Sequence, residues 1–312
     1  MEINPEHPLV SVAVIAYNSA EYILETLESV KAQTYDNIEL VISDDCSKDN
    51  TVELCRQWIM ENRSRFSAVH IVQSPVNTGQ SGNYNRAFDA CKGEWIKEID
   101  GDDKLLPNCV SDYIEFTQSH PDSKYIFGKM EYIGDAEVVA SVKKWFDYNF
   151  FSMTTEQQLH RLLYDGNCVP SPSSFYNREF IKAIGFRNDE RIPYLEDYPK
   201  WINLLRKGVR FHLMDKVVAE YRVGNGISTG GKQSVAFYKT GLLFDYYYRF
   251  PAWYADDNEA AVNRMVNAQV ELYEHKLQLE DEIKRLRETK AYRLGKLILK
   301  PFSWLKKKER IA

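Results

Sequence analysis

The first hundred residues alternate between short apolar runs and segments whose apolar residues recur at helical spacing. Four runs rich in β-branched residues have the composition of buried strands, and they cover residues 9–15, 38–42, 69–72 and 95–99. Such alternation predicts right-handed strand–helix–strand units. The chain should therefore adopt an α/β fold with a mainly parallel, Rossmann-like sheet and helices on both faces.

Polar turns follow three of these strands, at residues 16–18, 44–45 and 100–103. In parallel sheets the ligand binds outside the carboxyl ends of the strands, so the fold should gather these turns into one cleft. Asn18, followed three residues later by Glu21, also predicts a capping box at the start of the first helix.

The run Asp100-Gly101-Asp102-Asp103 places three carboxylates within four residues. In a folded protein these groups repel one another unless a cation or solvent relieves them. Mg²⁺ and Mn²⁺ prefer oxygen ligands and commonly bind one or two carboxylates together with substrate phosphates. At a strand end the run therefore predicts a metal site on a diphosphate, and the alternative is an acidic loop with Gly101 at its turn.

Two further turns have a functional and a structural interpretation. A carboxylate of Asp44 or Asp45 at a strand end can accept the N3–H of uracil or a ribose hydroxyl, but aspartate also ends strands and caps helices. Backbone N–H groups of residues 77–79, before a helix, could bind a phosphate. Taken alone, each turn favours the structural interpretation.

Glu196 and Asp197 begin a predicted helix over residues 197–207. A carboxylate at a helix N-terminus is stabilised by the helix dipole, which makes capping one interpretation. The other is a general base for an acceptor hydroxyl. The local pattern leaves both open.

Length and composition limit the possible classes. The 312 residues, 44% of them hydrophobic, can bury the core of one large or two modest domains. We expect a nucleotide-sugar-binding half over residues 1–105, an acceptor-binding half over 106–250 and C-terminal helices over 251–312. Heptad-like spacing over residues 256–290 could support a homodimer.

No apolar run approaches the ~20 residues needed to cross a bilayer, and the five scattered cysteines indicate a cytoplasmic protein.

Charge is distributed unevenly along the chain. The net charge is -5, yet residues 290–312 carry +7 and residues 1–289 carry -12. The acidic body argues against a nucleic-acid partner. In the basic tail, Phe302 and Trp304 lie among lysines, which is typical of an interfacial anchor, and the alternative is a solvated end. We expect residues 290–312 to bind the inner face of the cytoplasmic membrane peripherally.

Taken together, these segments resemble glycosyltransferase family 2, inverting enzymes of the GT-A fold, and within it the bacterial polysaccharide and O-antigen type. The resemblance covers about residues 8–230 and is most specific in the first hundred. It rests on residues 10–18 (VSVAVIAYN), 29–35 (SVKAQTY), 44–49 (DDCSKD), 77–79 (NTG), 93–103 (GEWIKEIDGDD), 188–190 (NDE), 196–198 (EDY) and 221–222 (YR).

The resemblance implies a nucleotide site at the first two turns. Ala16, Tyr17, Asn18 and Asp45 would hold the nucleotide, with Asp45 at the base. Cys46 departs from the family pattern, because glycine is usual at this position.

The resemblance also implies the metal ligands and the base. Asp102 would touch the ribose or diphosphate and lie beside the metal, and Asp103 would be the main ligand of Mn²⁺ or Mg²⁺. Asp197 would be the catalytic base, with Glu196 beside it. Because Arg222 is followed by Val223 and not by the histidine often seen nearby, diphosphate and water would complete the metal shell.

The implied function is transfer of a hexose from a UDP-sugar to a saccharide acceptor, linked to undecaprenyl diphosphate, in surface polysaccharide biosynthesis. The transfer would be a single in-line displacement that inverts the anomeric carbon. One alternative is a non-catalytic binding or scaffold protein on the same fold. A second is a sugar-1-phosphate nucleotidyltransferase, whose glycine-rich first loop with Arg and Lys is not found at residues 16–20.

Overall fold

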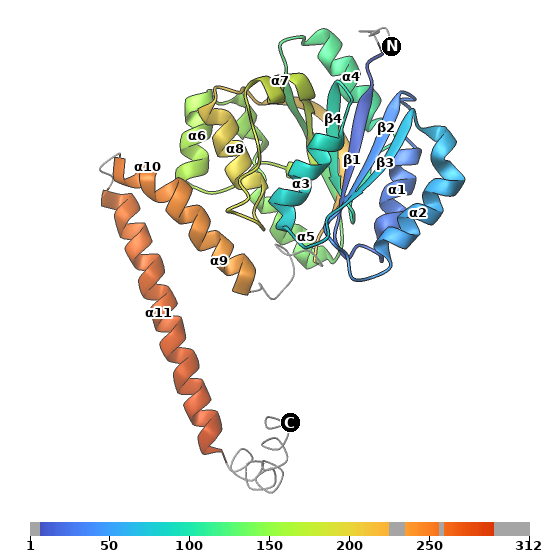
Figure 1. Ribbon diagram of the computed structural model, residues 1–312. Helices are drawn as coiled ribbons and strands as arrows, with labels where there is room; N and C mark the ends of the chain where they lie inside the picture. The colour runs from blue at the N-terminus through green and yellow to red at the C-terminus, as the bar shows by residue number, and fades with distance from the viewer. Residues whose placement is uncertain (1–6, 225–234, 256–258, 290–312) are drawn as a thin grey trace, which may run out of the picture. The chain divides into compact units, whose positions relative to one another are not determined.

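The computed structural model describes residues 7–224, 235–255 and 259–289 (Figure 1). The chain divides into two compact units, residues 1–252 and 253–312. The predicted membrane-binding tail, residues 290–312, lies outside the described residues.

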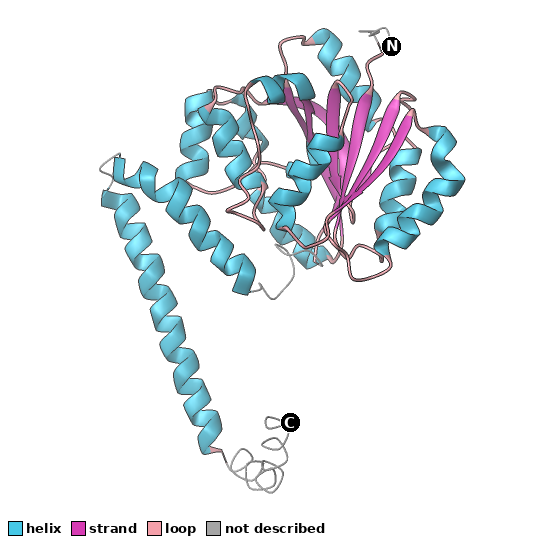
Figure 2. Ribbon diagram, in the orientation of Figure 1, coloured by secondary structure: helices cyan, strands magenta, loops and turns pink. Residues whose placement is uncertain are grey.

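In the described part of the chain, eight strands form one sheet in the order β3-β2-β1-β4-β7-β6-β8-β5 (Figure 2). The strands are β1 (Val10–Ala16), β2 (Ile38–Asp44), β3 (Ala68–Gln73), β4 (Trp95–Asp100), β5 (Lys104–Leu105), β6 (Tyr125–Ile133), β7 (Ser174–Asn177) and β8 (His212–Arg222).

Helices cover both faces of the sheet, as the strand–helix alternation predicts. Figure 1 shows α1 and α2 on one side, and α3, with α6 and α8, on the other. The α-helices are α1 (Ile23–Lys31), α2 (Thr51–Asn62), α3 (Gly79–Ala90), α4 (Cys109–Ser119), α5 (Ala136–Val142), α6 (Thr155–Tyr164), α7 (Arg178–Ala183), α8 (Asp197–Arg206), α9 (Val235–Phe244), α10 (Phe250–Ala255) and α11 (Glu259–Glu288). Short 3-10 turns are η1 (Arg63–Arg65), η2 (Lys143–Trp145), η3 (Tyr148–Ser152) and η4 (Ser171–Ser173), and η5 (Asp245–Arg249) is a π-helix.

The parallel half of the sheet brings the three polar turns to one level. β1 pairs in parallel with β2 and with β4, and every residue of β1 and β2 is buried, as their apolar runs predict. The register sets Ala16 opposite Asp44 and Ile15 opposite Asp100. The turns after these strands therefore start side by side at the carboxyl edge.

The second half of the sheet is mixed. β7 runs antiparallel to both β4 and β6, β8 runs parallel to β6, and β5 pairs antiparallel with β8. The prediction of a mainly parallel sheet with helices on both faces is confirmed. The sheet is continuous across the predicted boundary at residues 105 and 106, which stays a prediction.

The predicted capping box at the first helix is wrong. α1 begins at Ile23, and no side chain caps it. Asn18 instead adopts a left-handed φ of 50°, its N–H donates to Ser47 Oγ at 2.8 Å, and its Oδ1 accepts from the Lys48 N–H at 2.7 Å. These bonds tie the turn after β1 to the turn after β2, which takes the side chain away from the helix.

In the second unit, α11 is the long helix that the heptad-like spacing predicts. Leu272, Leu279, Ile283 and Leu286 on it are all exposed. Homodimer formation through residues 256–290 stays a prediction. No helix in the described segments is both long and apolar enough to cross a membrane.

Gly93, just before β4, provides a test of the packing that holds β4 against β1. A Cβ there would lie 2.5 Å from Ser11 N and 2.8 Å from Leu9 O, both backbone atoms. We expect Gly93→Ala to lower the free energy of unfolding by about 2 kcal/mol in urea titrations. Gly241→Ala in α9, where a Cβ meets nothing within 4 Å, is the matched control and should not destabilise. Equal stability of both variants would contradict this packing.

Candidate active site

The turn after β1 leaves Tyr17 and Asn18 exposed at the carboxyl edge. The carbonyl of Ala16 accepts from Asp45 N at 3.0 Å and from Asn83 Nδ2 at 3.1 Å, so the protein itself uses this group. Tyr17 leaves 43% of its surface exposed. Of the predicted nucleotide residues in this turn, Tyr17 therefore has the aromatic surface most available to a base.

The carboxylates after β2 are bound within the protein. The Asp44 carboxylate accepts from the backbone N–H and the hydroxyl of Ser47. Asp45 is 2% exposed, and its Oδ2 accepts from Thr78 N and Gly79 N at 2.8 Å each. Its Oδ1 accepts from Thr78 Oγ1 at 2.6 Å and from Arg86 Nη2 at 3.0 Å.

Asp45 thus occupies the anion position at the N-terminus of α3. A carboxylate offers about four acceptor sites, and the protein fills four at Asp45. The N–H groups at residues 78 and 79 that could have held a phosphate are bound to Asp45 instead, which supports the structural interpretation of both turns. A contact between Asp45 and a base stays a prediction, and it would have to replace one of these bonds.

Cys46 explains why glycine is usual in this turn. It adopts a φ of 67°, in the left-handed region that costs a residue with a Cβ roughly 1–2 kcal/mol. The turn keeps the same conformation without glycine, and bonds from Ser47 and Lys48 to its neighbours hold it in place.

The aspartate run lies at the end of β4, and its members have different surroundings. Asp100 Oδ1 accepts from the hydroxyl of Tyr84 at 2.8 Å. Asp103 is 1% exposed, and its Oδ1 accepts from Arg222 N at 2.8 Å. Its Oδ2 is buried and has no hydrogen-bond partner within the described residues. Asp102 is only partly buried.

Burial and mutual repulsion act strongly on this run. Burial, followed by repulsion from Asp102, raises the pKa of Asp100 to about 7, with a further contribution from Asp197. Burial, then Asp102 and Asp100, raises the pKa of Asp103 well above its ordinary value. Burial also raises the pKa of Asp102. A divalent cation would relieve this repulsion and give the unpaired Asp103 oxygen a partner.

The number of available carboxylates fits a cation shared with a substrate. No cluster of three or more His, Cys, Asp or Glu side chains suited to a metal occurs in the described segments. Asp102 and Asp103 can supply one or two ligands, which is what Mg²⁺ and Mn²⁺ use when substrate phosphates complete the shell. The residues present therefore fit a metal–diphosphate site.

Arg222, at the end of β8, joins the acceptor half to the aspartate run. Besides its N–H bond to Asp103, its Nε donates to the carbonyl of Asp102 at 2.9 Å. Its Nη2 reaches Glu25 at 2.8 Å, and its guanidinium lies 4.2 Å from the ring centroid of Tyr22. The family resemblance includes Arg222, but only the structure shows that Arg222 binds the aspartate run.

Glu196 and Asp197 stand at the start of α8, which confirms the predicted helix. Asp197 Oδ2 accepts from Asn167 Nδ2 at 2.7 Å, and its Oδ1 from Tyr198 N at 2.7 Å. Glu196 is buried and makes no side-chain capping bond, so helix capping does not account for it. Burial raises the pKa of both carboxyls, and Asp100 raises that of Glu196 further. Glu196, Asp197 and the aspartate run therefore lie at one site.

Sequence reasoning missed Asn167, Tyr84 and Arg86. Each binds a predicted site aspartate, but Asn167 lies 30 residues before Asp197 and Arg86 lies 41 after Asp45. No spacing pattern connects such pairs. The one available signal was that Tyr84 and Arg86 lie on the helix that follows the turn at residues 77–79.

Asp45→Asn tests whether Asp45 holds the protein together. An amide has one acceptor oxygen, so it cannot accept all four bonds, and we expect a loss of about 3 kcal/mol in the free energy of unfolding. Chemical denaturation of the nucleotide-free protein measures this. Asp215→Asn, at a side chain 78% exposed, is the matched control and should change stability little. Unchanged stability with lost nucleotide affinity would instead make Asp45 a base contact.

Comparisons with known proteins agree with this geometry. The model of the family "Glycosyl transferase family 2" matches residues 11–185. The chain is 30% identical over 226 residues to the UDP-Glc:alpha-D-GlcNAc-diphosphoundecaprenol beta-1,3-glucosyltransferase WfaP of Escherichia coli, covering 72% of this chain and 81% of that protein. It is 28% identical over 229 residues to the putative teichuronic acid biosynthesis glycosyltransferase TuaG of Bacillus subtilis, covering 73% and 84%.

Solved structures show the same fold. The S. aureus TarS 1-349 structure in complex with UDP-GlcNAc aligns with a TM-score of 0.58 at 22% identity, over 76% of this chain and 66% of that chain. The mannosyltransferase PcManGT from Pyrobaculum calidifontis, with GDP-Man and Mn²⁺, aligns with a TM-score of 0.56 at 17% identity, over 94% and 85%. This chain therefore has the GT-A fold. It belongs to glycosyltransferase family 2 and is a glycosyltransferase.

Proposed function

We propose that this enzyme transfers a hexose from a UDP-sugar to a saccharide linked to a polyprenyl diphosphate, with inversion, in bacterial surface polysaccharide synthesis. The donor and acceptor follow the activity for which WfaP, a relative with 30% identity, is named. The polysaccharide setting is supported by WfaP and TuaG together. The enzyme class itself rests on the family.

The observation that carries this proposal is the meeting of two acidic groups from distant parts of the chain. The aspartate run follows β4, and Glu196-Asp197 begins α8, yet the charge of Asp197 raises the pKa of Asp100. A donor diphosphate beside one group and an acceptor hydroxyl beside the other would place a sugar carbon between them. That arrangement suits a single in-line displacement.

The donor half of the site would use Tyr17, Asp102 and Asp103. Tyr17 offers an exposed ring at the edge for the base. Asp103, whose buried Oδ2 has no partner within the described residues, would be the main ligand of the ion. Asp102, the more exposed carboxylate of the two, would lie beside the ion and the diphosphate. Bound Mn²⁺ or Mg²⁺ would neutralise the charge of the departing diphosphate.

The acceptor half would use Asp197 as the general base. Asn167 and the Tyr198 N–H each fill one acceptor site on a different oxygen, which fixes the carboxylate plane and leaves lone pairs for an acceptor hydroxyl. Asp197 would take the hydroxyl proton as the oxygen attacks the anomeric carbon. Glu196, buried beside it, would add a second negative charge to the acceptor side. The buried charge of Glu196 must itself be compensated by a cation.

Peripheral binding to the inner face of the cytoplasmic membrane completes the proposal. A lipid-linked acceptor brings the substrate to that surface, and the basic, aromatic residues 290–312 would meet it there. Those residues lie outside the described part of the chain, so only their sequence supports this step.

Asp197→Asn is the direct test of the base. We expect at least a ~100-fold loss of transfer, because a positioned base contributes roughly 10²–10⁴ in rate. The assay measures UDP release from a panel of UDP-hexoses and GDP-mannose, with Mn²⁺ and a synthetic polyprenyl-diphosphate N-acetylglucosamine acceptor. UDP affinity, measured by calorimetry, should stay within about twofold of wild type.

Asp215→Asn, a surface substitution of the same kind, should retain full activity in that assay. Full transfer activity of Asp197→Asn would refute the role of Asp197 as the general base. Release from GDP-mannose but from no UDP-sugar would refute the donor class and leave the base untouched.

A further inference from the structure

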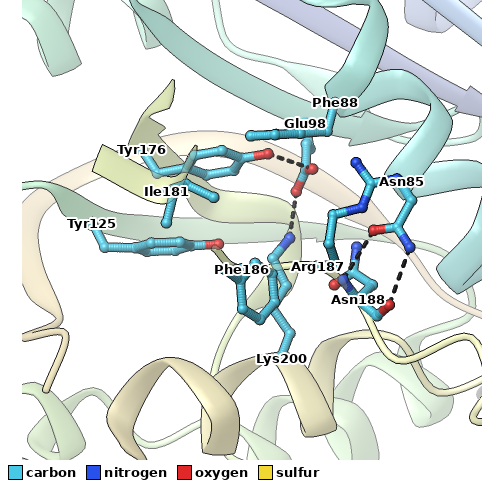
Figure 3. A pocket seen from close by; sticks show the side chains of 10 residues that line it. All are labelled: Asn85, Phe88, Glu98, Tyr125, Tyr176, Ile181, Phe186, Arg187, Asn188 and Lys200. Carbon is cyan, nitrogen blue, oxygen red and sulfur yellow. Dashed lines mark hydrogen bonds and ion pairs between the residues drawn. The ribbon is translucent and has the colours of Figure 1, made fainter. Parts of the chain in front are cut away.

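A buried ion pair joins the two halves of the site. Lys200 Nζ lies 2.5 Å from Glu98 Oε2, and these side chains are 3% and 5% exposed. The hydroxyl of Tyr176 donates to the other oxygen of Glu98 at 2.6 Å. Figure 3 shows Glu98 between Tyr176 and Lys200.

The pair links the two elements that carry the acids. Glu98 lies on β4 two residues before Asp100, so both side chains point to the same face of the strand. Lys200 lies on α8 one turn after Glu196, on the same side of that helix. The pair therefore connects the strand of the aspartate run to the helix of the base.

This pair is too enclosed for a sugar or nucleotide to reach it. The cavity beside it has a volume of about 10 Å³, which admits roughly one water and no sugar. Lys200 is enclosed by the rings of Tyr84, Tyr176 and Trp201, whose centroids are 5.2, 5.5 and 5.4 Å from Nζ. Any effect of Lys200 on transfer must act through other residues.

The positive charge of Lys200 acts on Glu196 and Asp197. Burial alone would lower the pKa of the ammonium, but Glu98, Tyr125 and Glu196 together raise it, so Lys200 stays charged. Burial raises the pKa of Glu196 and of Asp197, and the Lys200 charge opposes that rise at both. Repulsion from Asp197, and then from Asp100, also raises the pKa of Glu196. Hydrogen bonds from Asn167 and from backbone N–H groups at residues 196–198 lower the pKa values of the pair.

We propose that Lys200, held in place by Glu98, is a positioning residue that keeps the Glu196-Asp197 pair ionised and aligned with the aspartate run. The inference rests on the proposed role of Asp197 as base. A buried ion pair is a weak source of stability on its own, which is consistent with a role in setting charge and alignment.

The test is the acid limb of the pH dependence of kcat/KM, which reports ionisation of the base in the free enzyme. Lys200→Met removes the favourable charge, so the limb should move up by about one pH unit. Glu98→Gln leaves the ammonium uncompensated, so the limb should move down. Lys200→Arg keeps the charge and should restore most of the wild-type profile.

Glu98→Gln/Lys200→Met carries no unpaired buried charge and serves if Lys200→Met does not fold. The charge of Lys200 acts on both carboxyls of the Glu196-Asp197 pair. The double variant should therefore still shift the limb upward, by less. UDP affinity should match wild type in each folded variant. An unchanged limb in both Lys200→Met and the double variant would overturn the proposal. If Asp197→Asn proves active, it is the proposed base that fails.

Discussion

Five carboxylates converge on the carboxyl edge of the sheet, and the need to compensate their charge organises the structure around it. They are Asp100, Asp102, Asp103, Glu196 and Asp197. The charge of each buried carboxylate is compensated by a different group. A tyrosine hydroxyl binds Asp100, the Arg222 N–H binds Asp103, Asn167 binds Asp197, and the charge of Lys200 lowers the pKa of Glu196. Asp102 is only partly buried, so a bound substrate can complete its compensation.

The compensating groups also connect distant parts of the chain. Arg222 belongs to β8 and Lys200 to α8, whereas their partners Asp103 and Glu98 follow or lie on β4. The same contacts that offset charge therefore fix the spacing between β4, β8 and α8. Asp45 plays a related part within the donor half, because it fills the anion position at the start of α3 and orders that turn.

The sequence predicted the donor half well because local patterns decide it. Fully buried parallel strands must be apolar throughout, so β1 and β2 were visible as runs, and the turns after them had to share an edge. The resemblance to the family assigned roles to Asp197 and to the aspartate run, and these roles stay predictions. Asn18 was misassigned because a helix cap and a turn-to-turn bond need the same polar side chain.

The rest depended on contacts that no local pattern records. The mixed order of β7, β6 and β8 follows from how irregular, aromatic-rich segments pack against β4. Lys200 and Glu98 are 102 residues apart, and each alone reads as an ordinary surface charge. The four bonds to Asp45 show the reverse case, since a residue assigned to the nucleotide by resemblance is bound by its own chain.

We propose that a cation and a diphosphate together complete the site beside Asp102 and Asp103. Calorimetric titration of Mn²⁺ into the protein, with and without saturating UDP, measures this directly. Because the protein supplies one or two ligands, Mn²⁺ should bind weakly alone and at least tenfold more tightly with UDP, and Asp102→Asn should remove that gain. Equal Mn²⁺ affinity with and without UDP, or a gain that persists in Asp102→Asn, would contradict the account.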